Sequence, residues 1–588
     1  MNNPYFDLMK QWCDRLLDFQ VKGMGDDRLD GGLLCPACTR MHGRSADVIY
    51  PLLTVAEYTG DSKYIEAAKA LYQWTELNFK LPNGGYTNDR DSFWFGISAF
   101  YQVSLCEALL YHGHLLDAET VAQWKKSIQD VTDFLVEHIY NSKPVVNYRA
   151  GMAASMALAA KVLEEPKYLE KAREYAEEIY TYIYEDFLYG EAKPLDTLSP
   201  KGCRSIDLGY NMEETMGSLA LYVKHTGDEK MKQCLLRLLY HHLKFMMPDG
   251  AIDNSFGVRS AKWTYYGSRT SDGCQIGYGA FGGEDPILAE AAHRNFELLK
   301  ACTVDGLLCG GPMHEEAGEP ACLHHSFCHA KALAFLVDNH FEYKEPAKLP
   351  CEAGDAVEFY KPLHVYKIRK GGWHASVTGY DHPGQCCSGG AMTLLWHEKC
   401  GPIFAASNPK YVLVEPSNMQ ISRSSLVLCQ TPHIAYNQGE EVGTTPLFKQ
   451  EARFNNLYDL SAEIARDGDS FAVTGSLRDA GGNPAAAFHL GYEFTEDQIT
   501  ITASCDAEDA SYRMPVIASS REEIQLTENS LEVRGNGFVK RITANVPIRA
   551  EQALDKRNFN PTGGFQAFII SAAMDTGKPV TFTISVHE

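Results

Sequence analysis

The chain has 588 residues, of which 45% are hydrophobic, and it carries a formal net charge of −22 at pH 7. A chain of this length exceeds one compact core, so we expect at least two domains. The negative charge argues against a surface for nucleic acid or for an anionic membrane, although a few local cations suffice to hold an anionic sugar.

The N-terminal residues MNNPYFDLMKQWCDRLL contain no basic segment followed by an apolar one, and no stretch reads as a transmembrane helix. The 17 cysteines are odd in number and form no compact framework. We therefore expect a cytoplasmic protein with reduced thiols and no disulfides. A secreted protein that had lost its leader would show the same features.

Amphipathic helices are predicted from the N-terminus to about residue 340. Helical periodicity covers residues 46–59, 94–112, 118–139, 148–163, 210–225, 285–301 and 323–338. A short break followed by Lys recurs three times between helices, which indicates a repeated helical hairpin. At the first break, Gly60 ends one helix and either Asp61 or Ser62 caps the next. Such pairs close into a solenoid or into a toroid.

Two irregular segments, 185–208 and 250–284, are longer than ordinary connections, and we interpret them as functional loops. From about residue 351 the hydrophobic period changes to two, as in 497–505 and 580–586. Such strands favour an antiparallel β-sandwich. The segment 342–356 is the expected linker, which divides the chain into domains at 1–342 and 350–588.

The first cluster of reactive side chains is Cys35, Cys38 and His42, with the spacing C-x2-C-x3-H. A structural zinc site needs four ligands and only three are local, so buried thiols and a zinc site both stay open. Arg44 and Asp47 follow at the start of a helix. They form either an ion pair that holds the rim of the domain or a pair that faces substrate.

Two further clusters lie at predicted helix starts. Asn88 and Asp91 can cap the helix that follows them, and Trp94 is a candidate platform for a sugar ring or a core residue. Asn147 begins an Ala-rich helix. It is either a simple cap or, together with Arg149, an anion site at a helix N-terminus.

The later clusters are richer in acids, aromatic residues and histidines. Glu213 and Glu214 are explained by the helix dipole, whereas Tyr210 in the same turn is not. The loop 249–273 carries Trp263, Arg259 and Lys262, and we expect Tyr265, Tyr266 and Arg269 within it to face substrate. His324 and His325 begin the last predicted helix. His325 shares a face with His329, and no H-E-x-x-H motif is present, so a neutral imidazole that binds or protonates substrate is expected.

Together these features resemble the heparinase II/III-like and alginate-lyase-like polysaccharide lyases, which pair an (α/α) toroid with an antiparallel β-sandwich. The resemblance covers most of the chain and the pattern of an Asn at the start of an Ala-rich helix, here Asn147. It implies an (α/α) toroid or incomplete barrel followed by the sandwich. Two departures stand out. The family commonly has Asn-His where this chain has Asn147-Tyr148. The family's sandwich often carries a strand rich in His, Ser and Asp, for which this chain offers only GGWHASVTGYDH, with His374.

The resemblance implies β-elimination on a uronic acid. By order along the chain, Tyr210 would transfer protons while Asn147 and His325 bind the carboxylate. The expected substrate-binding residues are Trp94, Arg149, Glu214, Tyr265, Tyr266, Arg269 and His324. The expected partner is an anionic oligosaccharide or polysaccharide, with no nucleic acid and no membrane, and the oligomeric state is open.

Other classes of protein stay open. A toroid glycoside hydrolase would use paired carboxylates, drawn from Asp207, Glu213, Glu214, Glu315 and Glu316. A narrower alternative is a zinc-bound Cys nucleophile at Cys386 and Cys387 with Cys322 and Glu319, and a non-enzymatic alternative is a sugar-binding protein. No cofactor is required by the sequence, although a structural zinc or another divalent metal is compatible with it.

Overall fold

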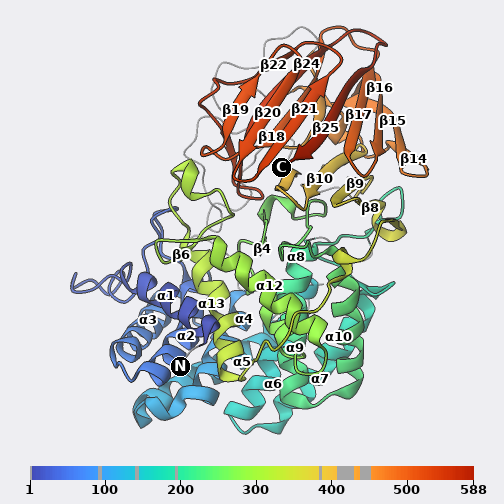
Figure 1. Ribbon diagram of the computed structural model, residues 1–588. Helices are drawn as coiled ribbons and strands as arrows, with labels where there is room; N and C mark the ends of the chain where they lie inside the picture. Colours follow the sequence, from blue (N-terminus) through green and yellow to red (C-terminus); the bar gives the residue numbers. More distant parts are fainter. Residues whose placement is uncertain are drawn as a thin grey trace.

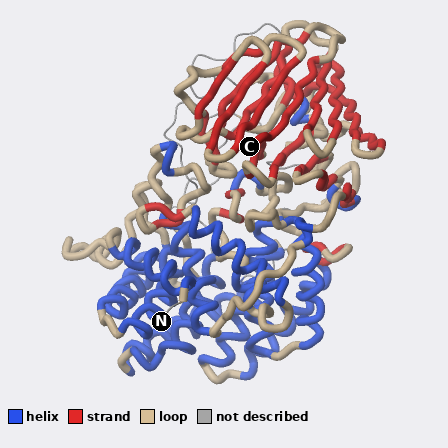
Figure 2. The backbone as a smooth tube through the Cα atoms, in the orientation of Figure 1, coloured by secondary structure: helices blue, strands red, loops and turns tan. Residues whose placement is uncertain are grey.

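The computed structural model describes residues 3–90, 96–138, 145–192, 197–382, 387–406, 429–437 and 452–588. Its N-terminal part consists of helices and its C-terminal part of antiparallel sheets, as Figures 1 and 2 show. This arrangement confirms the predicted fold class.

The helices of the N-terminal part are α1 (Pro4–Leu17), α2 (Ile49–Thr59), α3 (Lys63–Phe79), α4 (Ile97–His112), α5 (Ala118–His138), α6 (Val146–Val162), α7 (Pro166–Ile179), α8 (Leu208–Tyr210), α9 (Met216–Thr226), α10 (Glu229–His242), α11 (Gln275–Gly279), α12 (Pro286–Ala301) and α13 (Leu323–Asp338). Consecutive helices pack as pairs, for example α2 on α3, α6 on α7 and α9 on α10. The last helix, α13, packs against α1 and α2, so the helical domain closes on itself as a toroid.

The helix ends follow from their residues. Gly60 ends α2 in a left-handed conformation (φ 69°), which glycine adopts without strain. Of the two predicted caps for the next helix, Asp61 is the one that acts, because its carboxylate accepts a hydrogen bond from the backbone N–H of Lys63 at 3.0 Å. Helix α1 was not predicted. It begins at Pro4, and the side chain of Asn3 caps its first turn.

The C-terminal part contains two antiparallel sheets. The smaller has the strand order β11-β10-β9-β8-β7, formed by β7 (Ala356–Tyr360), β8 (Val365–Lys370), β9 (Trp373–Thr378), β10 (Ala391–His397) and β11 (Gly401–Ala405). The larger has the order β19-β20-β21-β25-β17-β16-β15-β13-β12-β18-β24-β22, with β14 paired to β15 and β23 to β24. Its shorter strands are β12 (His433–Tyr436), β13 (Phe454–Asn455), β14 (Glu463–Asp467), β19 (Glu523–Leu526), β20 (Ser530–Gly535), β21 (Phe538–Ala544), β22 (Ile548–Ala550) and β23 (Asn558–Asn560). Its longer strands include β15 (Ser470–Arg478), β16 (Pro484–Phe494), β17 (Gln498–Cys505), β18 (Ala510–Ile517), β24 (Phe565–Met574) and β25 (Val580–His587).

The period-two pattern of the sequence is confirmed in β25, where Val580, Phe582, Ile584 and Val586 are all buried. Their side chains join one core with residues of the smaller sheet, including Trp373. The two sheets therefore pack face to face as a sandwich.

The two domains contact each other through loops at the helix starts. Trp263, in the hairpin of β3 (Trp263–Thr264) and β4 (Gly267–Ser268), belongs to one apolar cluster with Trp396 and Phe565 of the sheets. Figure 1 places α8 and β4 at the end of the helical domain that faces the sandwich. The loops at these helix starts therefore lie between the two domains.

The described residues contain no helix suited to a membrane and no disulfide. None of their helices combines the length and the apolar character that crossing a bilayer requires. Each described cysteine is free of a disulfide, and most of these thiols are buried.

A buried carboxyl in the toroid yields a prediction about pH. Glu107 of α4 is 1% exposed, and one of its carboxyl oxygens has no hydrogen-bond partner among the described residues. Burial raises its pKa from 4.5 to about 8. The unfolded chain therefore ionises Glu107 first as pH rises, so its contribution to stability is complete below the unfolded pKa and is lost as pH rises through about 8.

We expect Glu107→Gln to remove this loss, which amounts to a few kcal/mol. The melting temperature of the variant should fall less between pH 5 and pH 8 than that of the wild type, as measured by scanning calorimetry. The exposed Glu119 offers a matched control, because Glu119→Gln should leave the wild-type pH dependence unchanged. Parallel curves for the Glu107→Gln and wild-type proteins would contradict the prediction.

Candidate active site

The central side chain of the site is Tyr210, at the end of α8. Asp207 caps this helix by accepting the backbone N–H of Tyr210 at 2.8 Å, and a π-helical turn, Asn211–Thr215, joins α8 to α9. The Tyr210 hydroxyl contacts the hydroxyl of Thr270, and Lys262 Nζ donates to it at 3.3 Å. The Arg259 guanidinium lies 4.8 Å from the centre of the Tyr210 ring. Two cations therefore surround one buried phenol.

Asn147 belongs to the same network. Its amide donates to Glu191 Oε1 at 3.0 Å, and Arg259 Nη1 lies 2.9 Å from the same oxygen. Glu191 is fully buried, and burial raises its pKa to about 7. The interpretation of Asn147 as a helix cap is wrong, because α6 begins at Val146 with Val145 as its cap residue and Asn147 lies inside the first turn. Glu191 and Arg259 thus connect Asn147 to Tyr210.

The two glutamates of the π-helical turn hold the loop that follows the β3–β4 hairpin. Glu213 Oε2 accepts the Ser268 N–H at 2.6 Å and the Ser271 hydroxyl at 2.5 Å. Glu214 accepts the Asp272 N–H at 3.1 Å, and burial raises its pKa to about 8. Both carboxyls are therefore engaged in positioning the loop that carries Thr270.

A buried charge cluster supports the same loop. The Arg44 Nε atom lies 3.0 Å from Asp47, and its Nη1 donates to the Thr270 carbonyl at 2.5 Å. Lys331 Nζ lies 3.1 Å from Asp47 and 2.8 Å from Asp272, which Arg44 also contacts at 2.7 Å. Of the two roles considered for Arg44 and Asp47, the structure shows the ion pair. The Asp47 and Asp272 carboxylates are both paired with cations, so we do not expect this cluster to bind a metal ion.

His325 lies on the first turn of α13. The Tyr266 hydroxyl bonds to its Nδ1 at 2.5 Å, and its Nε2 faces Gly310. Burial and the nearby Arg269 lower the pKa of His325 well below its ordinary value, so the ring is neutral. His325 and Tyr210 both lie at helix starts on the side of the sandwich.

His324 precedes His325 on the first turn of α13. Burial lowers its pKa well below the ordinary value, and the positive charges of Arg44 and Lys262 contribute. Its Nε2 has no hydrogen-bond partner among the described residues, and its ring packs edge-on against His42 at 4.6 Å. Lys262 is thus a neighbour of both His324 and Tyr210.

The other predicted site residues make contacts of a different kind. Arg149 is two residues beyond Asn147, about 200° around the helix, and its guanidinium contacts Glu178 of α7 at 3.0 Å, away from Glu191. Tyr265 packs against Phe565 between the domains rather than facing an open site. Arg269 donates to the Pro561 carbonyl of the sandwich.

The segment 87–101 supplied further predicted residues. Trp94 and Asp91 lie outside the described residues. The interpretation of Asn88 as a helix cap is wrong, because α4 begins only at Ile97. Asn88 instead accepts the backbone N–H of Arg44 at 3.1 Å.

The carboxylates considered for hydrolysis have structural partners. Asp207 is a helix cap, and Glu316 contacts Ser519 and Ser520 of the sandwich. Cys387 Sγ lies 3.4 Å from the Thr431 hydroxyl, whereas Cys322 lies beside Cys35 in the helical domain. Among the described residues, the proposed zinc-bound nucleophile is therefore not assembled. Its second member, Cys386, lies outside them.

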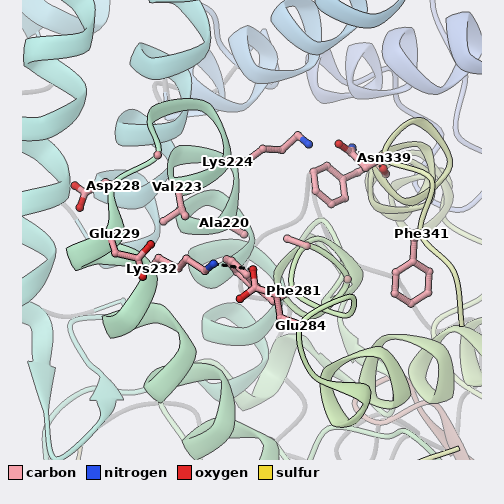
Figure 3. Close-up of a pocket in the computed structure, with 14 residues that line it drawn as sticks. Ala220, Val223, Lys224, Asp228, Glu229, Lys232, Phe281, Glu284, Asn339 and Phe341 are labelled. Carbon is pink, nitrogen blue, oxygen red and sulfur yellow. Dashed lines mark hydrogen bonds and ion pairs between the residues drawn. The ribbon is translucent and has the colours of Figure 1, made fainter. Parts of the chain in front are cut away.

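A separate pocket opens at the other end of the toroid (Figure 3). It is lined by side chains near the ends of α9 and α13, including Lys224, Phe335 and Asn339, and an ion pair of Lys232 with Glu284 at 2.7 Å crosses it. Asn339 follows the last residue of α13, whereas His325 is on its first turn, so the two ends lie about 20 Å apart. We therefore keep this pocket separate from the candidate site.

Four residues complete the Tyr210 site: Glu191, Arg259, Lys262 and Thr270. All four lie in the segments 185–208 and 250–284, whose unusual length marked them as functional loops. Length alone did not single out Glu191, which lies 44 residues from Asn147 in the sequence.

Comparisons with known proteins agree with this architecture. Two family models, described as "Ulvan lyase N-terminal domain" and "Ulvan lyase C-terminal domain", match residues 9–352 and 357–587. The broad-specificity ulvan lyase of Formosa agariphila is 34% identical in an alignment covering 99% of this chain and 93% of that protein.

Two solved structures show the same fold. The chondroitin AC lyase of Streptomyces coelicolor A3 has a TM-score of 0.56 at 14% identity, covering 99% of this chain and 80% of its own. The Paenibacillus xanthan lyase has a TM-score of 0.58 at 9% identity, covering 99% of this chain and 57% of its own. The predicted resemblance to toroid-and-sandwich lyases is confirmed. The family models match both domains, and the ulvan lyase of Formosa agariphila aligns with nearly the whole chain. The chain therefore belongs to the ulvan lyase family and is a polysaccharide lyase that breaks acidic glycans by elimination.

Proposed function

We propose that the chain cleaves ulvan, the glycan for which its family is named. We further propose that Tyr210 transfers the protons of the elimination. The observation that carries the proposal is the position of the Tyr210 hydroxyl. It contacts Lys262, lies beside Arg259, and is connected through Arg259 and Glu191 to Asn147. A proton-transfer group and groups that bind a carboxylate thus occupy one network.

The chemistry explains why these residue types belong together. Elimination at a uronic acid removes the C5 proton, which is weakly acidic because the neighbouring carboxylate resists further negative charge. Donors that neutralise this carboxylate stabilise the enolate-like transition state. Arg259 and Lys262 supply positive charge, and the Asn147 amide has a second N–H besides the one that faces Glu191.

Tyr210 then performs the proton transfer. As a phenolate beside two cations, it takes the C5 proton while electrons flow to expel the C4 oxygen. The same hydroxyl, or water, returns a proton to the leaving oxygen. Thr270, whose hydroxyl contacts that of Tyr210, fixes the direction of the phenol.

His325 takes a less direct part in this proposal than the sequence predicted. A neutral ring cannot balance a carboxylate charge, and the Tyr266 hydroxyl already occupies its Nδ1. We assign the carboxylate to Asn147 and Arg259, and we give His325 and Tyr266 the role of a neutral hydrogen-bonding pair at the edge of the site.

The proposal predicts the product. Incubation with ulvan should give a rise in ultraviolet absorbance from a C4–C5 unsaturated uronate, in step with the appearance of new reducing ends. The matched control is the same glycan with its carboxyl groups reduced to alcohols, which should not be cleaved because its C5 proton is no longer acidified. Reducing ends without absorbance would indicate hydrolysis, and absorbance only with chondroitin or heparan sulfate would exclude ulvan as the substrate.

A further inference from the structure

A second cluster of reactive side chains lies beside the candidate site and takes no part in the proposed elimination. The thiols of Cys35, Cys38 and Cys322 have their sulfur atoms within 4.8 Å of one another. Cys322 precedes α13 and lies 287 positions beyond Cys35 in the sequence. The fold therefore adds a distant third thiol to the local C-x2-C-x3-H pattern.

The fourth group is His42. Its Nε2 lies 3.0 Å from Cys38 Sγ, and its Nδ1 lies 2.7 Å from the Asp89 carboxylate. A carboxylate that accepts the N–H of one ring nitrogen leaves the other nitrogen with its lone pair directed outward. This is the usual support of a metal-binding histidine.

From this arrangement we infer that Cys35, Cys38, Cys322 and His42 bind a zinc ion. A tetrahedral zinc with Zn–S bonds of about 2.3 Å places two thiolates about 3.8 Å apart. The Cys35 and Cys322 sulfur atoms are 3.8 Å apart, far from the 2.05 Å or so of a disulfide. Tetrahedral zinc would hold a sulfur and a nitrogen ligand about 3.6 Å apart, so the His42 ring needs to shift by roughly half an ångström.

The local backbone presents the first two thiols on one side. The N–H of Thr39 donates to the Cys35 carbonyl at 2.9 Å, and the N–H of Cys35 donates to the Arg40 carbonyl at 2.9 Å. These bonds fold residues 35–40 into a tight turn. Zinc sites commonly hold two cysteines of such short spacing on one turn.

The ligand set selects both the metal and its role. Three thiolates and one imidazole favour zinc over magnesium or calcium, which prefer oxygen ligands. The four residues are between 1% and 8% exposed, and four protein ligands leave no position for substrate, so the site is structural. It joins the segment before α2 to the start of α13, which also carries His324 and His325. The zinc would thus hold together the first and last parts of the toroid beside the active site.

Metal analysis of the full-length protein tests this inference. Protein produced with zinc in the medium, then dialysed against EDTA, should retain about one zinc per chain by mass spectrometry. A thiol-reactive mercurial should release that zinc and lower the melting temperature. Cobalt-substituted protein should show the absorption of tetrahedral cobalt bound to thiolates.

Two variants serve as a matched pair. Cys322→Ala should lose the zinc, whereas Cys302→Ala, at an equally buried thiol on the end of α12, should retain it. Because Cys322→Ala could fail to fold, the wild-type measurement decides. Less than about one tenth of a zinc per chain in the wild type, or a disulfide between Cys35 and Cys322 in its peptide map, overturns the inference.

Discussion

Replacing Tyr210 by Phe should lower kcat on the glycan at least roughly 100-fold, the usual scale for the loss of a general acid–base group. The substitution removes one hydroxyl and keeps the ring, which is 5% exposed and lies beside Arg259. Packing therefore changes little, and the melting temperature should stay close to that of the wild type. KM should change far less than kcat, because the carboxylate-binding groups Asn147 and Arg259 remain.

The control is Tyr278→Phe, at a fully buried tyrosine of α11 whose hydroxyl makes one hydrogen bond, to the Leu239 carbonyl at 3.2 Å. It removes the same atom from the same domain, and turnover should be near normal. If Tyr210→Phe also turns over near the wild-type rate, the assignment of proton transfer to Tyr210 fails. Tyr266, whose hydroxyl bonds to His325, then becomes the next residue to test.

Tyr210 was selected from the sequence because no structural reason explained a tyrosine at that position. Acidic residues in a first helical turn complement the helix dipole, and the structure gives Glu213 and Glu214 framework roles. A tyrosine in that turn has no such reason. Asn147 was selected correctly as a residue at a helix start, but its role as a cap depended on a boundary that is uncertain by one or two residues.

The partners of these residues were beyond the reach of the sequence. Glu191 contacts Asn147 and Arg259 across 44 and 68 positions, and no local pattern encodes such a pairing. The same holds for Cys322, which meets Cys35 only when the toroid closes. Residues that are adjacent in the sequence can also lie in different environments. Tyr265 packs between the domains, whereas Tyr266 contacts His325.

The buried charge cluster behind Thr270 gives the second large effect, this time on stability. Its cations are Arg44 and Lys331, and its acids are Asp47, Asp272 and Glu214. Burial raises the pKa of Glu214 to about 8, so this carboxyl is mostly protonated at pH 7. Two carboxylates then balance two cations, with the neutral Glu214 beside them.

Asp47→Asn should therefore lower the free energy of unfolding by about 3–5 kcal/mol at pH 7, because it leaves a buried cation without its partner. Glu214 can partly compensate for this change, because it can release its proton and replace the negative charge of Asp47. Glu214→Gln alone should cost little at pH 7, yet the same change in the Asp47→Asn background should cost clearly more. Urea unfolding of the four proteins measures this non-additivity. If the stability losses of Asp47→Asn and Glu214→Gln are additive in the double variant, Glu214 does not replace the charge of Asp47. If Asp47→Asn is as stable as the wild type, the cluster does not hold the loop that positions Thr270 against Tyr210.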